Sequence, residues 1–447
     1  MTTLPSMPYP AIDGARLLFG HMPEMQRDTY GFYLRYHRAH GDCLRFNAYP
    51  FINFYSFAAP DALHHILVKA RQKYSRGARW SRIVSYIGGN GIVTSTDDVW
   101  EKQRRTVTPY FQPAHVDKYA AMIVRNTAEM ATKWQRAGTA VSVNISREMM
   151  SLGLINISDM LFNYNIRPRV ETFASAMLDG FYYINRFIQN PLTPPRFLPL
   201  PVNRRFSRDK AAADAVVRDI ITAARKDDEH SMINALVRSG NTDRQLHDEI
   251  ITLLMAGYDT LSTAIAWAWY SLAGNPAVLG KVREELRDVL GPQGLPDAKN
   301  IERLSYLRMV FKETLRLYPS AWAIHRFSEE ADEVLGYPVR KGSSVVLPLY
   351  VTHRHPDLWK HPDRFYPEHF DKSEAEGRPR FAYLPFGAGE HVCIGAHLAG
   401  MEGVLILATL LQHVTPKMAN EATIMPLVNF TLKPSQDIIA LAAPAAI

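Results

Sequence analysis

The segment Phe386-Gly-Ala-Gly-Glu-His-Val-Cys393-Ile-Gly395 decides how this chain is interpreted. Two glycines precede the cysteine and one follows it, and glycine lets the backbone turn tightly and approach a large flat ligand closely. A helix is predicted to begin directly after Cys393, where its N-terminus would stabilise a thiolate. A thiolate held in this way is suited to ligate haem iron. Taken alone, a cysteine at a helix start is more often a small buried residue or a reactive thiol.

The complete string is more specific, because it resembles the haem-binding loop of the cytochrome P450 family, usually written FxxGxRxCxG. Phe386, Gly389, Cys393 and Gly395 match that pattern, and Cys393 takes the place of the axial iron ligand. His391 stands where the family has an arginine that pairs with a haem propionate. Histidine donates one hydrogen bond and carries charge less reliably, so we expect a weaker propionate contact here.

A second motif lies in the helix predicted over 307–317. Glu313 and Arg316 are three residues apart and share a helix face, so they can pair, either on the surface or in the core. In the P450 family this is the ExxR motif, and its third member is the arginine of a PERF segment. Here that segment reads Pro-Glu-His-Phe over 367–370, so His369 replaces the arginine. We expect His369 to complete the network less rigidly.

A long apolar run extends from about 246 to 272 behind a capping box of Thr242 and Gln245. Such a run is typical of a membrane span, but charged residues interrupt it, so a helix through a protein core is predicted. Its centre, Ala-Gly-Tyr-Asp-Thr over 256–260, resembles the family's (A/G)Gx(D/E)T motif.

That resemblance implies a role for each central residue. Ala256 leaves room beside the metal, Thr260 offers a hydroxyl group, and Asp259 relays protons from solvent. The alternative from the residues alone is that Thr260 bonds a carbonyl one turn earlier and that Asp259 caps a surface pocket.

Two further segments match propionate-binding positions of the family. Trp100 and Arg104 resemble the WxxxR motif, whose side chains lie one helical turn apart, and Arg326 follows Arg316 by ten residues. For either arginine alone, a solvated surface position is the simpler interpretation. The five segments occur in the family's order, and the resemblance runs from about residue 40 to 434.

The resemblance implies the cytochrome P450 fold, mainly α with small β-sheets, as one large domain over 1–447. Residues 1–75 are expected to contribute much of the β-rich part, and 76–447 to be mainly helical and to carry the haem site. The composition, 47% hydrophobic and 21% charged, is that of a globular protein. Two cysteines exclude a disulfide framework and a zinc site of three or four thiolates. Short strands are predicted at 44–46, 52–57, 337–339, 344–349 and 430–432.

The implied activity is NAD(P)H-driven monooxygenation with haem b and O2, in which one oxygen atom enters a lipophilic molecule. Desaturation, coupling and peroxide-driven oxidation are alternatives within the family. By position, the substrate contacts fall on Ile92, Val93, Trp322, Ala323, Ile324 and Phe430. This apolar lining and an aromatic cluster at 181–188 favour a terpenoid, fatty acyl, steroid or polyketide substrate of secondary metabolism. Ordinary core packing would also explain the aromatic cluster.

The chain ends soon after the last predicted elements, so we expect electrons from a separate ferredoxin or flavodoxin-like protein. Such donors are typically acidic, and 51 Lys and Arg against 44 Asp and Glu give this chain a charge of +7. A solvated basic surface explains the same charge. No basic block resembles a nucleic-acid-binding tail, and residues 1–25 contain neither a secretory segment nor a transmembrane anchor. A cytoplasmic enzyme is expected.

Two other classes of protein remain open from the sequence. A non-enzymatic haem carrier or gas sensor would need the thiolate but not the Asp259–Thr260 pair. A metallohydrolase would use the histidines at 353, 355, 361 and 369, which lie in a proline-rich loop without helical ligand spacing.

Overall fold

The computed structural model describes most of the 447-residue chain. The described residues are 7–12, 14–15, 19–49, 52–136, 142–189, 193–226, 231–292, 294–419, 423–441 and 443–444. Residues 1–6, 13 and 16–18, which belong to the segment where we expected no anchor, lie outside them. The chain is mainly helical and divides into two compact units, each assembled from distant stretches of sequence.

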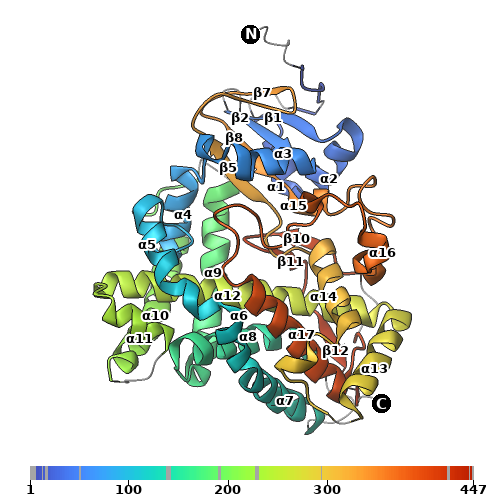
Figure 1. Cartoon of the computed structure of the whole chain (residues 1–447). Helices are drawn as coiled ribbons and strands as arrows, with labels where there is room; N and C mark the ends of the chain where they lie inside the picture. Colours follow the sequence, from blue (N-terminus) through green and yellow to red (C-terminus); the bar gives the residue numbers. More distant parts are fainter. Residues whose placement is uncertain are drawn as a thin grey trace. The chain divides into compact units, whose positions relative to one another are not determined.

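Unit 1 comprises residues 1–78, 312–393 and 426–428 and is built around a five-stranded sheet in the order β1-β2-β8-β5-β3. The sheet joins strands from both ends of the chain, so β1 and β2, in blue, lie beside β8 and β5, in orange (Figure 1). Strands β2 and β8 are parallel, and the other neighbours are antiparallel. The strands of this unit are β1 Cys43–Tyr49, β2 Ile52–Phe57, β3 Tyr74–Ser75, β5 Ile324–Ser328, β6 Asp332–Val334, β7 Tyr337–Val339, β8 Ser344–Leu347 and β10 Pro426–Val428.

Both faces of this sheet are buried, because successive side chains of a strand point to opposite faces. Phe54 and Val346 pack in one apolar cluster, whereas their neighbours Tyr55 and Val345 pack in another. Short helical segments cover the sheet. They are α1 Met22–Arg27, α2 Thr29–His40, α3 Pro60–His64, the π-helical turn η1 His65–Lys69, η2 Arg71–Lys73, α15 Leu349–Thr352, η7 Pro367–Phe370, α16 Lys372–Ala375 and η8 Arg380–Ala382.

Unit 2 comprises residues 79–311, 394–425 and 429–447 and contains most of the helices. These are α4 Ala78–Gly88, α5 Asp97–Val107, α6 Pro113–Val116, α7 Ala120–Arg136, α8 Ile145–Phe162, α9 Val170–Gln189, α10 Pro201–Ala224, α11 Met232–Arg238, α12 Asp243–Ala273, α13 Pro276–Leu290 and α17 Ala396–His413, while α14 Ser305–Leu317 runs from this unit into unit 1. The short strands are β4 Ser142–Asn144, β9 Val414–Thr415, β11 Leu432–Pro434, β12 Ile439–Leu441 and β13 Ala443–Pro444.

Helix α12 is the long core helix that the sequence predicts. The side chain of Gln245 accepts the N–H of Thr242 at 2.9 Å, and the Thr242 hydroxyl accepts the N–H of Gln245 at 3.3 Å, so the capping box is formed. The helix is long and apolar enough to cross a membrane, but 83% of its most apolar window is buried within the chain, as expected of a core helix.

Two glycines bring α8 and α12 close together. A Cβ at Gly153 would lie 2.6 Å from the Ser262 hydroxyl, and a Cβ at Gly257 would lie 2.6 Å from Ile157. Larger residues at either glycine would push the helices apart, so the motif at 256–260 also has a packing role.

Two predicted strand boundaries are wrong. The strand expected at 430–432 begins at Leu432 instead, and the strand expected at 344–349 ends at Leu347, after which α15 begins at Leu349. Strand ends depend on the pairing partner, which residue preference alone does not specify.

Candidate active site

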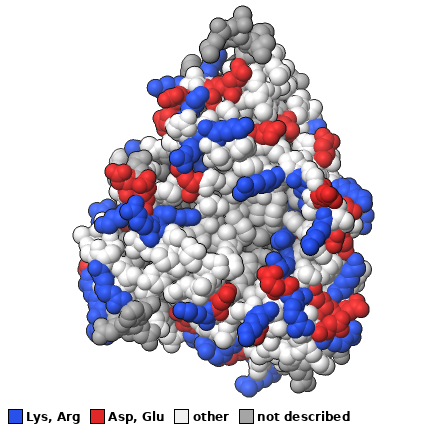
Figure 2. All heavy atoms as spheres, viewed as in Figure 1, with Lys and Arg blue, Asp and Glu red and all other residues white. Residues whose placement is uncertain are grey.

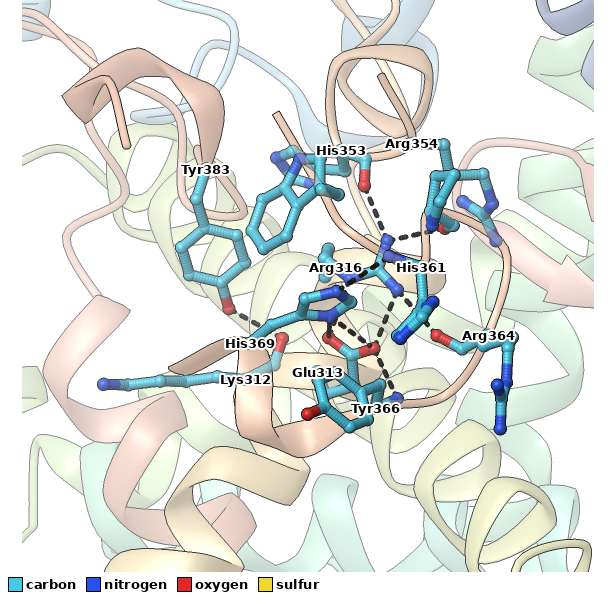
Figure 3. A network of polar contacts seen from close by, with 12 residues as sticks. Lys312, Glu313, Arg316, His353, Arg354, His361, Arg364, Tyr366, His369 and Tyr383 are labelled. Carbon is cyan, nitrogen blue, oxygen red and sulfur yellow. Dashed lines mark hydrogen bonds and ion pairs between the residues drawn. The ribbon is translucent and has the colours of Figure 1, made fainter. Parts of the chain in front are cut away.

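A buried ion pair in unit 1 holds the segment that leads to residues 386–395, which we call the cysteine loop (Figure 3). Glu313 and Arg316 on α14 are fully buried, and two N–O contacts of 2.7 Å join them side by side. The other N–H groups of the guanidinium donate to the carbonyl oxygens of His353, Pro362 and Arg364 at 2.8, 2.7 and 2.9 Å. All five donors are therefore used, which makes this buried charge tolerable.

His369 takes the third place in this network. Its Nδ1 lies 3.3 Å from both carboxylate oxygens of Glu313, and its Nε2 accepts the N–H of His361 at 3.4 Å. Because Nε2 accepts, the ring proton is on Nδ1 and is donated to Glu313. Trp359 packs edge-on against His369 and lies 5.0 Å from the guanidinium of Arg316. His369 thus completes the network at the position where the PERF segment of the P450 family has an arginine.

The network reaches the cysteine loop through His353. The Nε2 atom of His353 accepts the N–H of Leu384 at 2.9 Å, and the hydroxyl of Tyr383 donates to the carbonyl of Lys312 at 2.9 Å. Burial lowers the pKa of His353 to about 3, so the ring is neutral near pH 7 and remains an acceptor. Leu384, two residues before the cysteine loop, is therefore linked through His353 to Arg316 on α14.

The cysteine loop is a tight turn supported by its own backbone. The N–H of Cys393 donates to the carbonyl of Phe386 at 2.9 Å, and Gly387 and Gly389 adopt φ values of +72° and +77°. A Cβ at Gly389 would lie 2.3 Å from the carbonyl oxygen of Leu67 in η1, so the loop can rest there only with glycine. Helix α17 begins three residues after Cys393, behind Gly395.

The two thiols of the chain have opposite environments. Cys43 is buried in the core of unit 1, and burial raises its pKa to about 12, so it stays a thiol. The side chain of Cys393 is exposed. Of the two, only Cys393 is placed to ligate a metal.

Cationic side chains lie beside the cysteine loop. Nη2 of Arg76 is 2.8 Å from Nδ1 of His391, and Arg326 on β5 donates to the carbonyl of His325 at 2.9 Å. Burial lowers the pKa of Arg326 to about 10, and the negative charge of Glu390 offsets part of this effect. A desolvated cation of this kind is stabilised by an anionic ligand. The donor set therefore fits haem, which offers both an iron for the thiolate and carboxylates for the guanidinium.

In unit 2, α5 brings Trp100 and Arg104 together. They are one helical turn apart, and the guanidinium carbon of Arg104 lies 6.0 Å from the centre of the Trp100 ring. An indole N–H and a guanidinium side by side suit a carboxylate, as the WxxxR resemblance implies.

The centre of α12 contains the residues expected to handle protons. Ala256 and Thr260 are partly exposed, whereas Tyr258 and Asp259 between them are buried. The hydroxyl of Thr260 donates to the carbonyl of Ala256 at 2.8 Å, which is the local bond that the alternative interpretation foresaw. A hydroxyl group that donates its proton in this way can also accept hydrogen bonds through its oxygen.

Asp259 does not face solvent directly. It is 1% exposed, and it accepts hydrogen bonds from the Thr431 hydroxyl at 2.8 Å and from Nζ of Lys433 at 2.7 Å. The Lys433 side chain is itself 13% exposed, so this ammonium group lies between the acid and the surface. Sequence reasoning missed both partners because they are 172 and 174 residues away in the chain.

The residues predicted to contact substrate are divided between the two units. In unit 2, Ile92 is buried, Val93 is half-buried, and the Phe430 ring stacks on Phe181 of α9 with centroids 4.9 Å apart. In unit 1, Ala323 and Ile324 are half-buried beside Trp322. Trp322 packs 6.1 Å from Tyr33 and 6.3 Å from Tyr350, so part of its surface belongs to the core.

The aromatic cluster on α9 is partly core packing. Tyr183 stacks on Phe206 at 4.0 Å and donates to Asn203, whereas Tyr182 is 50% exposed. Only some members of the cluster are therefore available to a substrate.

Two consecutive acids of α12 hold the segment that carries Ile92. Asp248 accepts the N–H of Asn90 at 2.9 Å, and Glu249 accepts the N–H of Ile92 at 3.4 Å. A Cβ at Gly91 would lie 2.3 Å from the carbonyl oxygen of Asp248, so the segment lies directly on the helix. Burial raises the pKa of Glu249 to about 7, with a smaller contribution from the nearby charge of Asp248.

The four histidines that could suggest a metal site each contact other protein groups. His353 and His369 belong to the network around Arg316, His361 packs edge-on against Tyr366, and His355 pairs with Asp42. Among the residues that the structure describes, no group of three or more His, Cys, Asp and Glu side chains could hold a metal ion.

Comparison with known proteins identifies the family. Residues 10–441 match the cytochrome P450 family, so the chain belongs to it, and both units are parts of one family domain. The predicted fold class, mainly α with small β-sheets, is confirmed.

Several relatives are enzymes of Streptomyces. Cyclooctatin synthase of Streptomyces melanosporofaciens is 32% identical over 411 residues, which cover 89% of this chain and 87% of that protein. Cyclooctat-9-en-7-ol 5-monooxygenase of the same organism is 29% identical over 410 residues, covering 89% and 87%. Pentalenene oxygenase of Streptomyces avermitilis is 26% identical over 425 residues, 92% of each chain. The protein is therefore an oxidoreductase of a family whose chemistry uses haem, O2 and electrons from NAD(P)H.

The first prediction concerns the buried pair. Replacing Glu313 by glutamine leaves the Arg316 charge buried without a counter-charge, so we expect a loss of about 3–5 kcal/mol in the free energy of unfolding. Urea denaturation measures this. The control is Glu302→Gln, which breaks an exposed pair with Arg308 and should cost less than about 1 kcal/mol. Equal, small losses in both variants would contradict the assigned role.

The second prediction concerns pH. The pKa of Glu249 is raised above its ordinary value of 4.5 to about 7 in the folded chain, so folding disfavours the ionised form. Stability is therefore lost as pH rises from about 4.5 through 7, on the order of 3 kcal/mol for this group. Glu249→Gln keeps an acceptor for the Ile92 N–H and should reduce this loss.

Urea denaturation at pH 5.5 and pH 8 provides the measurement. Burial also raises the pKa of Glu402 to about 7, so Glu402→Gln is the matched variant, and the double variant should flatten the pH dependence further. A Glu249→Gln protein that loses as much stability as the wild type between the two pH values would refute the assignment.

Proposed function

We propose that this protein is a haem-thiolate monooxygenase that inserts one oxygen atom of O2 into a lipophilic small molecule. The observation that carries the proposal is the exposed thiol of Cys393 in a glycine-shaped loop, whose start is held by the buried Glu313–Arg316–His369 network. Haem b, when bound, supplies the oxidative chemistry. The residues that would hold it are Cys393 as axial ligand, Trp100, Arg104 and Arg326 toward the propionates, Phe386, Gly389 and Gly395 in the loop, and Ala256 on α12.

Thr260 and Asp259 are proposed to control protons. The Thr260 hydroxyl, which donates to its own helix, can accept a hydrogen bond from a water molecule and hold that water in place. Asp259 is the nearest acid along α12, and its exchange with solvent would pass through Lys433.

A terpenoid is the proposed substrate class. Two of the similar proteins are named for cyclooctat-9-en-7-ol and pentalenene. The half-buried apolar side chains of Val93, Ile324 and Phe430 suit a compact hydrocarbon better than a charged molecule. Hydroxylation is the proposed reaction, and product analysis distinguishes it from desaturation or coupling.

The proposed electron donor is a separate acidic protein, a ferredoxin or a flavodoxin-like protein, in the cytoplasm. The net charge of +7 favours such a partner. On the face drawn in Figure 2, Lys and Arg alternate with Asp and Glu, so recognition there would use individual basic residues. Reconstituting NADPH-driven turnover with each donor class identifies it.

A carbon monoxide difference spectrum of the reduced protein tests the proposed function. We expect a strongly red-shifted Soret band, because the thiolate of Cys393 donates electron density to the iron. Cys393→Ser should abolish this band, and Cys43→Ala, which changes the buried thiol, should keep it. A histidine-like band in the folded wild type, or a normal band in Cys393→Ser, would refute the assignment of Cys393.

The role of Thr260 is tested by substitution. Thr260→Ala removes the hydroxyl but not the helix, so we expect haem and substrate binding to persist while electrons are diverted to hydrogen peroxide. The ratio of peroxide formed to NADPH consumed measures this, and Thr260→Ser should restore product formation. An unchanged ratio in Thr260→Ala would show that the hydroxyl is dispensable.

A further inference from the structure

A chain of four alternating charges joins α10 to α12 in unit 2. Nζ of Lys210 lies 2.7 Å from both carboxylate oxygens of Asp214 on α10. Asp214 in turn lies 3.0 Å from Nε2 of His247 on α12, and Nδ1 of His247 lies 3.3 Å from Oδ1 of Asp248. Each of these four side chains is less than a quarter exposed, so solvent screens their attraction only in part.

This arrangement favours the charged form of His247. A carboxylate oxygen only accepts hydrogen bonds and each ring nitrogen faces one, so both nitrogens carry a proton. The hydrogen bonds to Asp214 and Asp248 raise the pKa of His247 above its ordinary value of 6.5, although burial and the charge of Lys210 oppose this. An imidazolium ion therefore bridges the two acids, whereas a neutral imidazole, which has a single N–H, could donate to only one of them.

The chain of charges ends at the segment 89–92. Oδ2 of Asp248 accepts the N–H of Asn90 at 2.9 Å, and a Cβ at Gly89 would overlap the same carboxylate, so the segment rests directly on this acid. The segment carries Ile92, one of the proposed substrate contacts, and contains no titratable side chain of its own. The protonation state of His247 therefore reaches it through Asp248.

We propose that His247 is a pH-dependent positioning residue that joins α10 to the substrate-contacting segment 89–92 through Asp248. The inference rests on the proposed function, which makes Ile92 a substrate contact. At and below about pH 6.5 the imidazolium holds both acids, and this contribution is lost as the pH rises through the raised pKa of His247. At alkaline pH the segment is then no longer tied to α10, and it opens more often.

Hydrogen exchange of the Asn90 amide in the haem-loaded protein tests this inference, because that N–H donates to Asp248. The protection factor already corrects for the intrinsic effect of pH on exchange, and we expect it to fall about five- to tenfold from pH 6 to pH 8.5 in the wild type. His247→Gln cannot carry the charge, so it should show the low value at both pH values. His247→Arg stays charged and has several donors, so it should keep the high value at both.

Two controls separate His247 from other titrating groups. Burial raises the pKa of Glu249 to about 7, so the measurement is repeated in Glu249→Gln, where the fall should persist. His355 also has a raised pKa because it pairs with Asp42, but this pair lies in unit 1, so His355→Gln should keep the fall.

A wild-type protection factor that does not change with pH, or a fall that persists in His247→Gln, overturns the proposal. The carbon monoxide spectrum separates this inference from the proposed function. A wild type without the thiolate band overturns the proposed function, whereas a normal band together with an unchanging protection factor overturns this inference alone.

Discussion

The buried pair of Glu313 and Arg316 is the interaction on which the rest of the site depends. A guanidinium at zero exposure is tolerable only because all five of its N–H groups are satisfied, two by the carboxylate and three by carbonyl oxygens. Those carbonyls belong to the irregular segment between residues 353 and 364, which has little regular structure of its own. The ion pair therefore fixes the backbone of this irregular segment. His353, which belongs to the segment, in turn binds the N–H of Leu384, just before the cysteine loop.

Two histidines stand where the family has arginines, and each has its own partners in the structure. At position 369 the ring lies 3.3 Å from both oxygens of the Glu313 carboxylate and accepts the backbone N–H of His361. At position 391 the imidazole lies 2.8 Å from the guanidinium of Arg76, which follows β3.

In unit 2, the centre of α12 combines close packing with proton chemistry. Gly257 lets α8 approach, while Asp259 turns toward β11 and is neutralised by Lys433. A lysine from the segment after α17 therefore pairs with the acid of the proposed proton path. The motif at 256–260 does not predict this partner. Phe430, stacked on Phe181, lies three residues before that lysine, so the same segment also carries a proposed substrate contact.

The sequence by itself determined the family, the fold class, the long core helix and the identities of Cys393, Glu313 and Arg316, since each depends on residues close together in the chain. Short spacing along a helix or turn fixes relative position, so the capping box at 242–245 and the ExxR pair were predictable. The partners of Asp259 and His391 were not, because Lys433 on β11 and Arg76 after β3 are brought to them only by the tertiary fold. Only the folded chain decides which distant cation reaches a given acid or imidazole, because hydrogen bonds act over about 3 Å whatever the separation in sequence.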